Sequence, residues 1–538
     1  MRIYLSTEGT YPFVLGGVST WADLLVRGLE DYEFHVAAIV DNPFHPLAFK
    51  PPRNVTLQAV PLWGSEMIDE YLSVPGSWRR ALRTSRAEVR RRFLPCWEPF
   101  VDALAVRESP SAALGDTLAE VAKFAERYDL RKALASQATW SVLLERLRSN
   151  ALTARVSSKS AIDFGRALFR FLLPLCAPIP RSDVAHMSAA GLCALPVIVS
   201  KYRYGTPVLL TEHGIYLRER VMASSALGVE DKFLLVNFYR AVTELAYRIA
   251  DVLAPVCAYN SSWEVALGVD PGRIRVVHNG LPGGELAHLG PVLPAGPPTI
   301  GFIGRIDPLK DVVTLLRAFA RVHKELPEAR LRLWGPASSP AYMSECQQVA
   351  ADLGLLRADS GGSAGSRGGA RHGHPPVTFE GRTSDLPTAY GACHVIALSS
   401  ITEGFPYTVV ESMLAARLVV ATDVGGVREA IGTVSVGPPG LGDAKSASSG
   451  TNEQPQAGSW AGARSDLLVD PGDPQALARA LLRALRAPER QRLAVALALR
   501  ERAQAQFNVS NFLGGYSEVY QQLAARGSQP LAGAVGAA

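Results

Sequence analysis

Short β-branched runs alternate with helical patterns along the chain, and this alternation constrains the fold more than any other feature. The runs are residues 2–6, 34–40, 55–60, 183–187, 207–211, 251–255 and 274–277 in the first half, and 299–303, 331–334, 377–380, 395–398, 418–421 and 467–469 in the second. Strands separated by helices pair in parallel and are covered by helices. The sequence therefore predicts an α/β protein with parallel sheets.

The chain is too long for one sheet domain. A length of 538 residues suits two large domains, and 48% hydrophobic with 20% charged residues is typical of a globular protein. The Pro/Gly-rich stretch 283–298 is the expected linker. We predict domains over 1–285, with a mostly helical insertion at about 64–180, and over 298–505, followed by a helix at 506–526. Residues 360–373, 438–462 and 527–538 have the composition of flexible segments.

Composition also excludes several classes of function. A net charge of +5 is mild for this length and does not indicate a nucleic-acid binder. The six cysteines show no C-x-x-C pairing, which argues against a disulfide framework or a zinc site. No signal-peptide core follows Met1, and no apolar run reaches transmembrane length. We expect a cytoplasmic protein without a transmembrane segment.

Two glutamates enclose the most telling stretch of the chain, E-G-F-P-Y-T-V-V-E at 403–411. Glu403 follows a predicted strand in a Gly/Pro turn, and Glu411 falls early in the next helical pattern. The carboxyl ends of parallel strands are where open α/β sheets bind ligands. Carboxylates can accept hydrogen bonds from sugar hydroxyls, and a helix start suits a phosphate. Glu411 alone could equally be a solvated helix residue.

A second loop carries two cations. The run G-F-I-G-R-I-D-P-L-K-D at 301–311 follows a predicted strand and opens an amphipathic helix marked by Val312, Leu315, Leu316, Phe319 and Val322. Arg305 and Lys310 could converge there on a diphosphate. Singly, each would be an ordinary surface charge. Together with Glu403 and Glu411, they favour binding of a sugar nucleotide.

These motifs resemble the retaining glycosyltransferases of family 4 in the sugar-transferase classification. The runs T-E-G-T-Y-P-F-V-L-G-G-V-S-T-W at 7–21 and T-E-H-G-I-Y-L-R-E-R at 211–220 are similar to the PelF-like branch, which acts in exopolysaccharide synthesis. The resemblance implies the GT-B fold, in which two Rossmann-like domains face a central cleft. It implies that 298–505 binds the donor and that the last helix crosses back to the N-terminal domain. The Asn-Gly of His278-Asn279-Gly280 resembles the hinge of the family, although Asn-Gly also suits a simple turn.

The resemblance also assigns roles to residues. Arg305 and Lys310 would bind the donor diphosphate, together with the loop of Gly16 and Gly17, which could otherwise be a tight turn. The donor hexose and ribose would be held by Glu403, Gly404, Phe405, Pro406 and Glu411. Glu403 would also belong to the catalytic set, with His213 and His186, both of which follow predicted strands. Each histidine could instead pack in the core, and His213 is the safer candidate because the position after Met187 is serine, where many relatives have a second histidine.

The resulting prediction is a retaining, metal-independent hexosyltransferase. It would move a hexose from a nucleotide sugar, UDP-glucose or another UDP-hexose, to a glycan acceptor, with no cofactor and no nucleic-acid partner. The chain has no Asp-x-Asp, and arginine and lysine can neutralise the leaving diphosphate instead of a metal. The alternative is a catalytically inactive GT-B subunit that binds a sugar nucleotide or acts as a scaffold in a polysaccharide synthesis complex.

One stretch outside these motifs is strongly basic. Residues 79–93 contain seven arginines and one glutamate, and Leu82, Val89 and Phe93 are spaced to share one helical face. Such a helix could dock on anionic lipid at the inner face of a membrane or on a membrane-bound synthesis complex. A solvated basic helix is the alternative.

Overall fold

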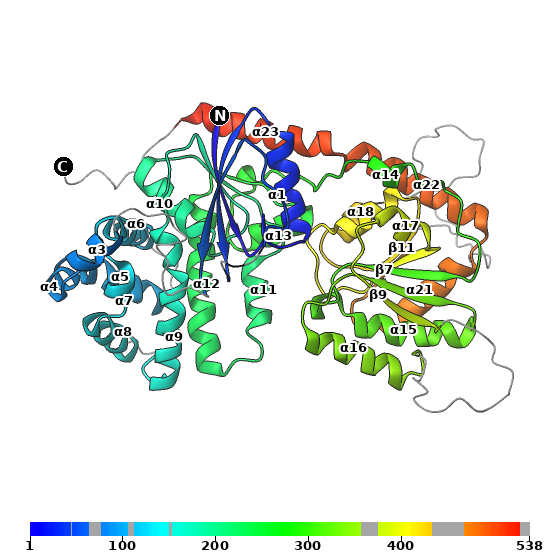
Figure 1. Cartoon of the computed structure of the whole chain (residues 1–538), viewed down its shortest axis with the longest axis horizontal. Coiled ribbons are helices and arrows are strands. Elements are labelled where there is room, and N and C mark those ends of the chain that lie inside the picture. Colours follow the sequence, from blue (N-terminus) through cyan, green and yellow to red (C-terminus); the bar gives the residue numbers. More distant parts are fainter. Residues whose placement is uncertain are drawn as a thin grey trace, which may run out of the picture. The chain divides into compact units, whose positions relative to one another are not determined.

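The computed structural model describes residues 1–42, 44, 46–63, 77–105, 112–149, 153–356, 375–432 and 467–527. The described chain forms two compact units (Figure 1). One contains Met1–His278 and the chain from Phe512 onward, and the other is Asn279–Asn511. The boundary therefore falls at His278, and the stretch 283–298 predicted as the linker lies inside the second unit. The expected flexible segments 360–373, 438–462 and 528–538 lie outside the described residues.

Unit 1 is built on a six-stranded parallel sheet in the order β3-β2-β1-β4-β5-β6. Its strands are β1 (Arg2–Glu8), β2 (Glu33–Val40), β3 (Val55–Pro61), β4 (Val184–Met187), β5 (Val208–Leu210) and β6 (Val252–Leu253). The sheet helices are α1 (Gly17–Gly28), α10 (Ala194–Tyr204), α11 (Tyr216–Ala223), α12 (Val229–Ile249), α13 (Ala258–Ala266) and the 3-10 turn η3 (Pro271–Arg273).

The predicted helical insertion forms a bundle on unit 1, grouped beside the sheet in Figure 1. It contains α3 (Ser77–Arg83), α4 (Arg86–Glu88), the π-helical turn η1 (Val89–Phe93), α5 (Leu94–Ala105), α6 (Ala112–Arg127), α7 (Leu130–Leu134), α8 (Gln137–Ser149), α9 (Ser158–Phe171) and the 3-10 turn η2 (Leu173–Cys176). α5, α6 and α9 pack on α10 or α12. The buried Trp97 and Phe100 of α5 belong to the same apolar core as Leu195 and Val197 of α10. The insertion therefore extends the core of unit 1.

Unit 2 has a second six-stranded parallel sheet in the order β12-β11-β10-β7-β8-β9. Its strands are β7 (Thr299–Ile303), β8 (Arg330–Trp334), β9 (Val377–Gly381), β10 (Val395–Leu398), β11 (Leu418–Thr422) and β12 (Leu468–Val469). The helices are α14 (Gly284–Ala287), η4 (Pro308–Lys310), α15 (Val312–Glu325), α16 (Pro340–Asp352), α17 (Leu386–Gly391), α18 (Tyr407–Leu414), α19 (Val427–Ile431), α21 (Pro474–Arg486) and α22 (Glu489–Gln506).

Helices cover both faces of the unit 2 sheet. α15 packs against α16 and α21, α18 packs against α22, and Figure 1 shows the two groups on opposite sides of the strands. The apolar stripe predicted for α15 is confirmed, because Val312, Leu315, Leu316, Phe319 and Val322 are all fully buried. These two parallel sheets confirm the predicted α/β fold class.

The last helix, α23 (Val509–Arg526), joins unit 1 through an aromatic cluster. The indole Nε1 of Trp21 donates to the hydroxyl of Tyr516 at 3.1 Å, and a ring nitrogen of His186 lies 2.7 Å from the hydroxyl of Tyr520. Trp21, Tyr516 and Tyr520 are fully buried. Buried tyrosines and tryptophans need such polar partners, so this network fixes α23 against β4 and α1.

One predicted strand and one predicted helix face are wrong. Residues 274–277 form no strand. Ile274 makes an isolated bridge to Leu253, and the amides of Arg275 and Val277 donate to the carbonyls of Leu253 and Pro255. The basic stretch 79–93 is not one continuous helix, because the chain breaks between α3 and α4, where Ser85 caps the new start. Leu82 is therefore 75% exposed, whereas Val89 and Phe93 are buried.

Candidate functional site

The strand order of unit 2 defines one place where two loops diverge. The chain runs from β7 outward to β8 and β9, then returns to the other side of β7 with β10 and continues to β11 and β12. The loops after β7 and β10 therefore leave adjacent strands in opposite directions. Such a switch point at the carboxyl edge is the usual ligand site of an open α/β sheet. These two loops are the ones that carry Lys310 and Glu403.

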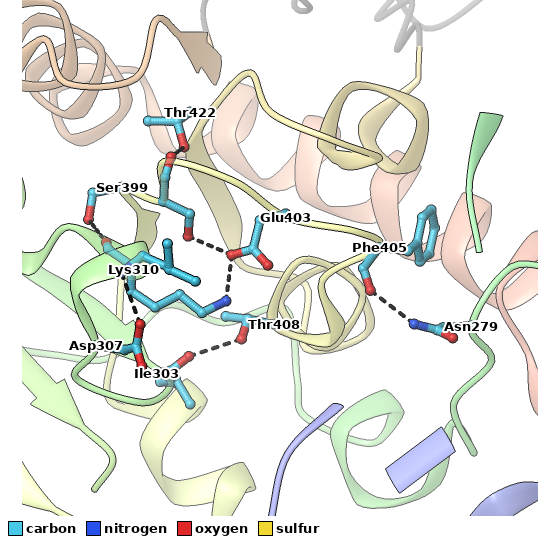
Figure 2. A network of polar contacts seen from close by, with 11 residues as sticks. Asn279, Ile303, Asp307, Lys310, Ser399, Glu403, Phe405, Thr408 and Thr422 are labelled. Atoms are coloured by element: carbon cyan, nitrogen blue, oxygen red, sulfur yellow. Dashed lines mark hydrogen bonds and ion pairs between the residues drawn. The ribbon is translucent and has the colours of Figure 1, made fainter. Parts of the chain in front are cut away.

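Lys310 and Glu403 contact each other at this switch point (Figure 2). The ammonium Nζ of Lys310 lies 2.5 Å from Oε1 of Glu403, and the hydroxyl of Ser400 donates to the same oxygen at 2.5 Å. The side chains are 22% and 9% exposed, respectively. Glu403 Oε2 accepts no hydrogen bond from any described residue. One oxygen thus orients the lysine, and the other is left for a hydroxyl donor.

The backbone around this ion pair is fixed by hydrogen bonds between the two loops. The hydroxyl of Ser399 donates to the carbonyl of Lys310 at 2.8 Å, and the amide of Ile401 donates to the carbonyl of Leu309 at 2.8 Å. Asp311, in the left-handed region with φ of 45°, caps α15 by accepting from the Thr314 amide. The position of Lys310 therefore depends on the β10 loop as well as on its own.

Two hydroxyls tie the loops to the neighbouring strands. Thr408, in the first turn of α18, donates to the carbonyl of Ile303 at the end of β7 at 2.9 Å. Thr422, at the end of β11, donates to the carbonyl of Ser400 at 2.7 Å. Figure 2 shows both contacts around the Lys310–Glu403 pair. The site is consequently held by three adjacent strands, which is the rigidity that ligand positioning needs.

Gly425, which the sequence did not single out, is required by the close approach of another loop. It has a φ of +56°, and a Cβ there would lie 1.9 Å from the carbonyl oxygen of Glu403. Its neighbour Gly426 donates its amide to the carbonyl of Gly404 at 2.6 Å. Only glycine permits this backbone contact. The glycine pair in the loop after β11 was the available signal.

The other unit 2 residues predicted to bind the sugar-nucleotide donor lie on the same two loops, but their surroundings differ from one residue to the next. Arg305 is exposed and makes no hydrogen bond or ion pair with a described residue, so its guanidinium is available to an anion. Phe405 is buried, stacks edge-on against Phe507 at 4.9 Å, and its carbonyl accepts from the amide group of Asn279 at 3.0 Å. That carbonyl is therefore committed to the fold. Pro406 precedes α18 as its cap residue.

Glu411 lies in α18 outside the Lys310–Glu403 network. Its Oε2 accepts from the hydroxyl of Tyr390 at 2.7 Å, while Oε1 accepts nothing from the described residues. Burial raises the pKa of Glu411, and the Tyr390 hydrogen bond opposes that shift. One carboxylate oxygen of Glu411 is thus without a hydrogen bond from the described residues, and Glu411 makes no hydrogen bond or ion pair with Lys310 or Glu403.

The candidate residues of unit 1 separate into exposed and buried groups. Gly16 caps α1 with extended backbone and Gly17 opens the helix; both are exposed, and a Cβ on Gly16 would meet nothing within 4 Å. His186 is fully buried, with its ring nitrogens 2.7 Å from the Tyr520 hydroxyl and 2.9 Å from the Thr211 hydroxyl. Neither nitrogen of His186 is free to meet a substrate in this conformation.

Of the two candidate histidines, His213 has a ring nitrogen without a hydrogen-bond partner among the described residues. Its Nε2 is buried and has no hydrogen-bond partner among the described residues, and its ring packs edge-on against Trp21 at 4.7 Å. Burial lowers the pKa of His213 to about 3, so the ring is neutral near pH 7. A neutral imidazole there can make a hydrogen bond with a hydroxyl but cannot supply a positive charge.

Two acids of unit 1, the partly buried Glu8 and the buried Glu212, were not recognised as individual features of the sequence. Glu8 ends β1 at the switch point between β1 and β4; its carboxylate accepts from the Leu192 amide at 2.6 Å and from the Tyr216 hydroxyl at 2.9 Å. Glu212 is fully buried and accepts from the Tyr247 hydroxyl at 2.6 Å. Glu8 is the last residue of β1 and Glu212 lies two residues after β5, and this placement at strand ends was the signal that could have identified them.

The described residues contain no group of three or more His, Cys, Asp or Glu side chains that could hold a metal ion. Within the same part of the chain, every helix is too short or too polar to cross a membrane.

Two family models match the chain. The model described as "Domain of unknown function (DUF3492)" covers residues 1–272, which is just over half of the sequence. The chain belongs to the DUF3492 family. A second model, "Glycosyl transferases group 1", covers residues 297–441 and so contains both loops of the unit 2 site. The DUF3492 protein thus carries a glycosyltransferase group 1 domain in its second half.

Curated relatives match only part of this DUF3492 protein. The D-inositol 3-phosphate glycosyltransferase of Nocardioides sp. is 34% identical over 173 residues, 29% of this chain and 35% of the relative. The enzyme of the same name from Mycobacterium tuberculosis is 30% identical over 244 residues, 43% of this chain and 45% of the relative. The match spans less than half the length of these relatives.

Solved structures share the fold over the whole chain. Anabaena HepE in complex with UDP has a TM-score of 0.52 at 15% identity and covers 97% of this chain and 100% of its own. Sucrose-phosphate synthase from Thermosynechococcus elongatus has a TM-score of 0.56 at 16% identity, covering 97% and 99%. With two parallel-sheet units and these neighbours, the DUF3492 protein has the GT-B glycosyltransferase fold.

Proposed function

We propose that this protein is a retaining hexosyltransferase that moves a hexose from a UDP-sugar, UDP-glucose or another UDP-hexose, to a glycan acceptor in extracellular polysaccharide biosynthesis. The observation that carries the proposal is the Lys310–Glu403–Ser400 contact at the unit 2 switch point, together with the exposed Arg305 on the same loop as Lys310. A cation oriented by a carboxylate, with a second cation on the same loop, suits the diphosphate of such a donor.

The donor would use the groups that the fold leaves unpaired. Lys310 has three N–H donors, so it can keep Glu403 and still bind phosphate oxygens. Arg305 would add a bidentate contact to the same diphosphate. Glu403 Oε2 would accept from a hexose hydroxyl, and Glu411 Oε1 would accept from the ribose. These four groups supply both charge neutralisation and sugar recognition.

The reaction would depend mainly on stabilising the leaving group. As the glycosidic bond breaks, negative charge grows on the diphosphate, so cations already in position stabilise the transition state more than the ground state. The acceptor hydroxyl would attack from the face that the diphosphate leaves, which retains the anomeric configuration without a covalent intermediate. The neutral His213 could hold a sugar hydroxyl by hydrogen bonding.

The donor class is supported by similarity. The solved complexes of HepE are with UDP and with UDP-glucose, and the sequence motifs resemble the PelF-like branch. At this low identity the neighbours argue for the shared fold, and the choice of UDP-glucose rests on the motifs together with that fold. A panel of nucleotide sugars therefore has to include other bases and other hexoses.

The test is release of free nucleoside diphosphate by the full chain from UDP-glucose, UDP-galactose, GDP-mannose and ADP-glucose, with and without oligosaccharide acceptors. The active donor is expected to carry UDP, and NMR of the product should show retained anomeric configuration. The Arg305→Ala, Lys310→Ala double variant should lose about 2–4 kcal/mol of transition-state stabilisation, roughly 30- to 1000-fold in kcat/KM.

Lys324→Ala is the matched control, because Lys324 is an exposed cation near the far end of α15. It should leave kcat/KM within about twofold of the unmodified protein. Near-normal turnover of the double variant would reject the assigned cation roles. If calorimetry shows UDP binding but no donor yields free nucleoside diphosphate, the protein would be a sugar-nucleotide-binding subunit and not a transferase.

A further inference from the structure

The positive charge of this protein is concentrated in one short segment. Residues 79–93 contain seven arginines and one glutamate, a net charge of +6, whereas the whole chain has a net charge of +5. The remaining residues together therefore carry a slight negative charge. A basic segment on an otherwise neutral chain is a specific surface feature, not part of a uniformly basic protein.

Most of these arginines are not engaged by acids of the protein. Glu88 pairs with Arg91 and Arg92 and accepts from the Tyr128 hydroxyl at 2.8 Å. By contrast, Arg79, Arg83, Arg86 and Arg90 are exposed and form no ion pair with any described residue. Their charge is therefore available to an external anionic partner.

An exposed apolar pair lies within the basic segment. Trp78 and Leu82, one helical turn apart on α3, are 62% and 75% exposed. The guanidinium of Arg79 lies over the Trp78 ring at 5.1 Å. Residues at i and i+4 share one face of a helix. A tryptophan and a leucine flanked by arginines have the composition of segments that lie in the membrane interface.

The basic segment packs firmly against the rest of unit 1. Val89 and Phe93 are buried, and Phe93 stacks on Trp97 with ring centroids 5.6 Å apart. Thr84 accepts from the Asp129 amide at 2.8 Å, and Lys132 donates to the carbonyl of Ala81 at 2.9 Å. Lys132 adds another cation at this place. The exposed arginines, Trp78 and Leu82 are thus carried by a segment that is fixed to the rest of unit 1.

We propose that α3, α4 and the start of η1 dock unit 1 on an anionic lipid bilayer. Trp78 and Leu82 would enter the interface between headgroups and acyl chains, and Arg79, Arg83, Arg86 and Arg90 would bind lipid phosphates. The apolar pair favours a bilayer over a nucleic acid or an acidic protein surface in water, because exposed tryptophan and leucine gain most from the apolar part of the interface. This docking is independent of the transferase proposal.

The experiment is flotation of the full chain with vesicles of phosphatidylcholine containing 0 or 30% phosphatidylglycerol, at 0.15 M salt. Binding is expected only with the anionic vesicles. Each basic residue near an anionic membrane contributes about fivefold to partitioning, so replacing Arg79, Arg83, Arg86 and Arg90 by Gln should reduce it by roughly 100-fold or more. The control replaces the exposed Arg317, Arg382, Arg479 and Arg490 by Gln and should bind normally.

The Trp78→Ala, Leu82→Ala variant distinguishes a bilayer from a general polyanion. Its binding to vesicles should weaken by roughly tenfold or more, whereas its binding to heparin should be unchanged. Its melting temperature should match that of the unmodified protein, because both side chains are exposed. The proposal is overturned if anionic vesicles fail to bind the protein, or if vesicle binding survives the loss of either the four arginines or the apolar pair.

Discussion

Glu264 is a buried acid that the fold leaves without a hydrogen bond. It lies in α13, is fully buried, and neither carboxylate oxygen has a partner among the described residues. Burial, with a smaller effect from the nearby Glu212, raises the pKa of Glu264 from 4.5 to about 9. Burial likewise raises the pKa of Glu212 to about 8, although the Tyr247 hydroxyl donates to it. Both acids are protonated in the folded protein near pH 7.

The sign of the pH dependence follows from these shifts. Below about pH 4.5 Glu264 is protonated in both the folded and the unfolded protein, and it does not oppose folding. Between 4.5 and about 9 Glu264 ionises only in the unfolded chain, so the free energy of unfolding falls as pH rises, by about 1.4 kcal/mol per pH unit. Glu212 adds a similar slope up to about pH 8. From pH 5 to pH 8 the Glu264 contribution alone amounts to about 4 kcal/mol. The Glu264→Gln side chain has nearly the same shape but cannot ionise, so the substitution should remove this loss of stability at high pH.

Hydrogen exchange read by mass spectrometry on peptides of α13 measures this effect within unit 1. The free energy of opening of the unmodified protein should fall from pH 5 to pH 8, and the difference between Glu264→Gln and the unmodified protein should shift by about 4 kcal/mol in favour of the variant. Glu120→Gln, on the surface of α6 with a 58% exposed side chain, is the control and should retain the original slope. An unchanged slope in Glu264→Gln would refute the reasoning.

Three further predictions concern single positions. Gly425→Ala should lower the thermal midpoint of unfolding by several degrees and turnover by at least roughly tenfold, because its Cβ would overlap the carbonyl of Glu403; an unperturbed melting curve would contradict this. Gly16→Ala should leave the melting curve unchanged, since nothing lies within 4 Å, but should lower kcat/KM if this loop meets the donor, and normal kinetics would remove Gly16 from the site. His186→Leu should cost about 1–3 kcal/mol in urea unfolding, because the buried Tyr520 hydroxyl loses its partner while the Thr211 hydroxyl keeps its contact with Tyr516; kcat per folded molecule should be retained, and a loss of kcat at full stability would instead support a catalytic histidine.

The Lys310–Glu403 ion pair shows how far local sequence patterns reach. Glu403 and Lys310 could each be placed after a strand because periodicity is a local property of the chain. The sequence assigned them separate roles, one for the hexose and one for the diphosphate. Their direct contact depends on β10 pairing with β7, two strands separated by more than ninety residues. No local pattern specifies that register.

The sequence by itself determined the α/β class, nearly all strands and the apolar stripe of α15, because these follow from alternation and spacing along the chain. It misplaced 274–277, where residues at a sheet edge have strand-like composition but make one bridge, and it overlooked Gly425, whose need for glycine arises from a distant carbonyl. Tertiary structure alone decided that His186 is enclosed by Thr211 and Tyr520, that Glu264 is buried without a partner, and that Leu82 is exposed. Burial and hydrogen bonding are properties of neighbours in space, which sequence spacing does not encode.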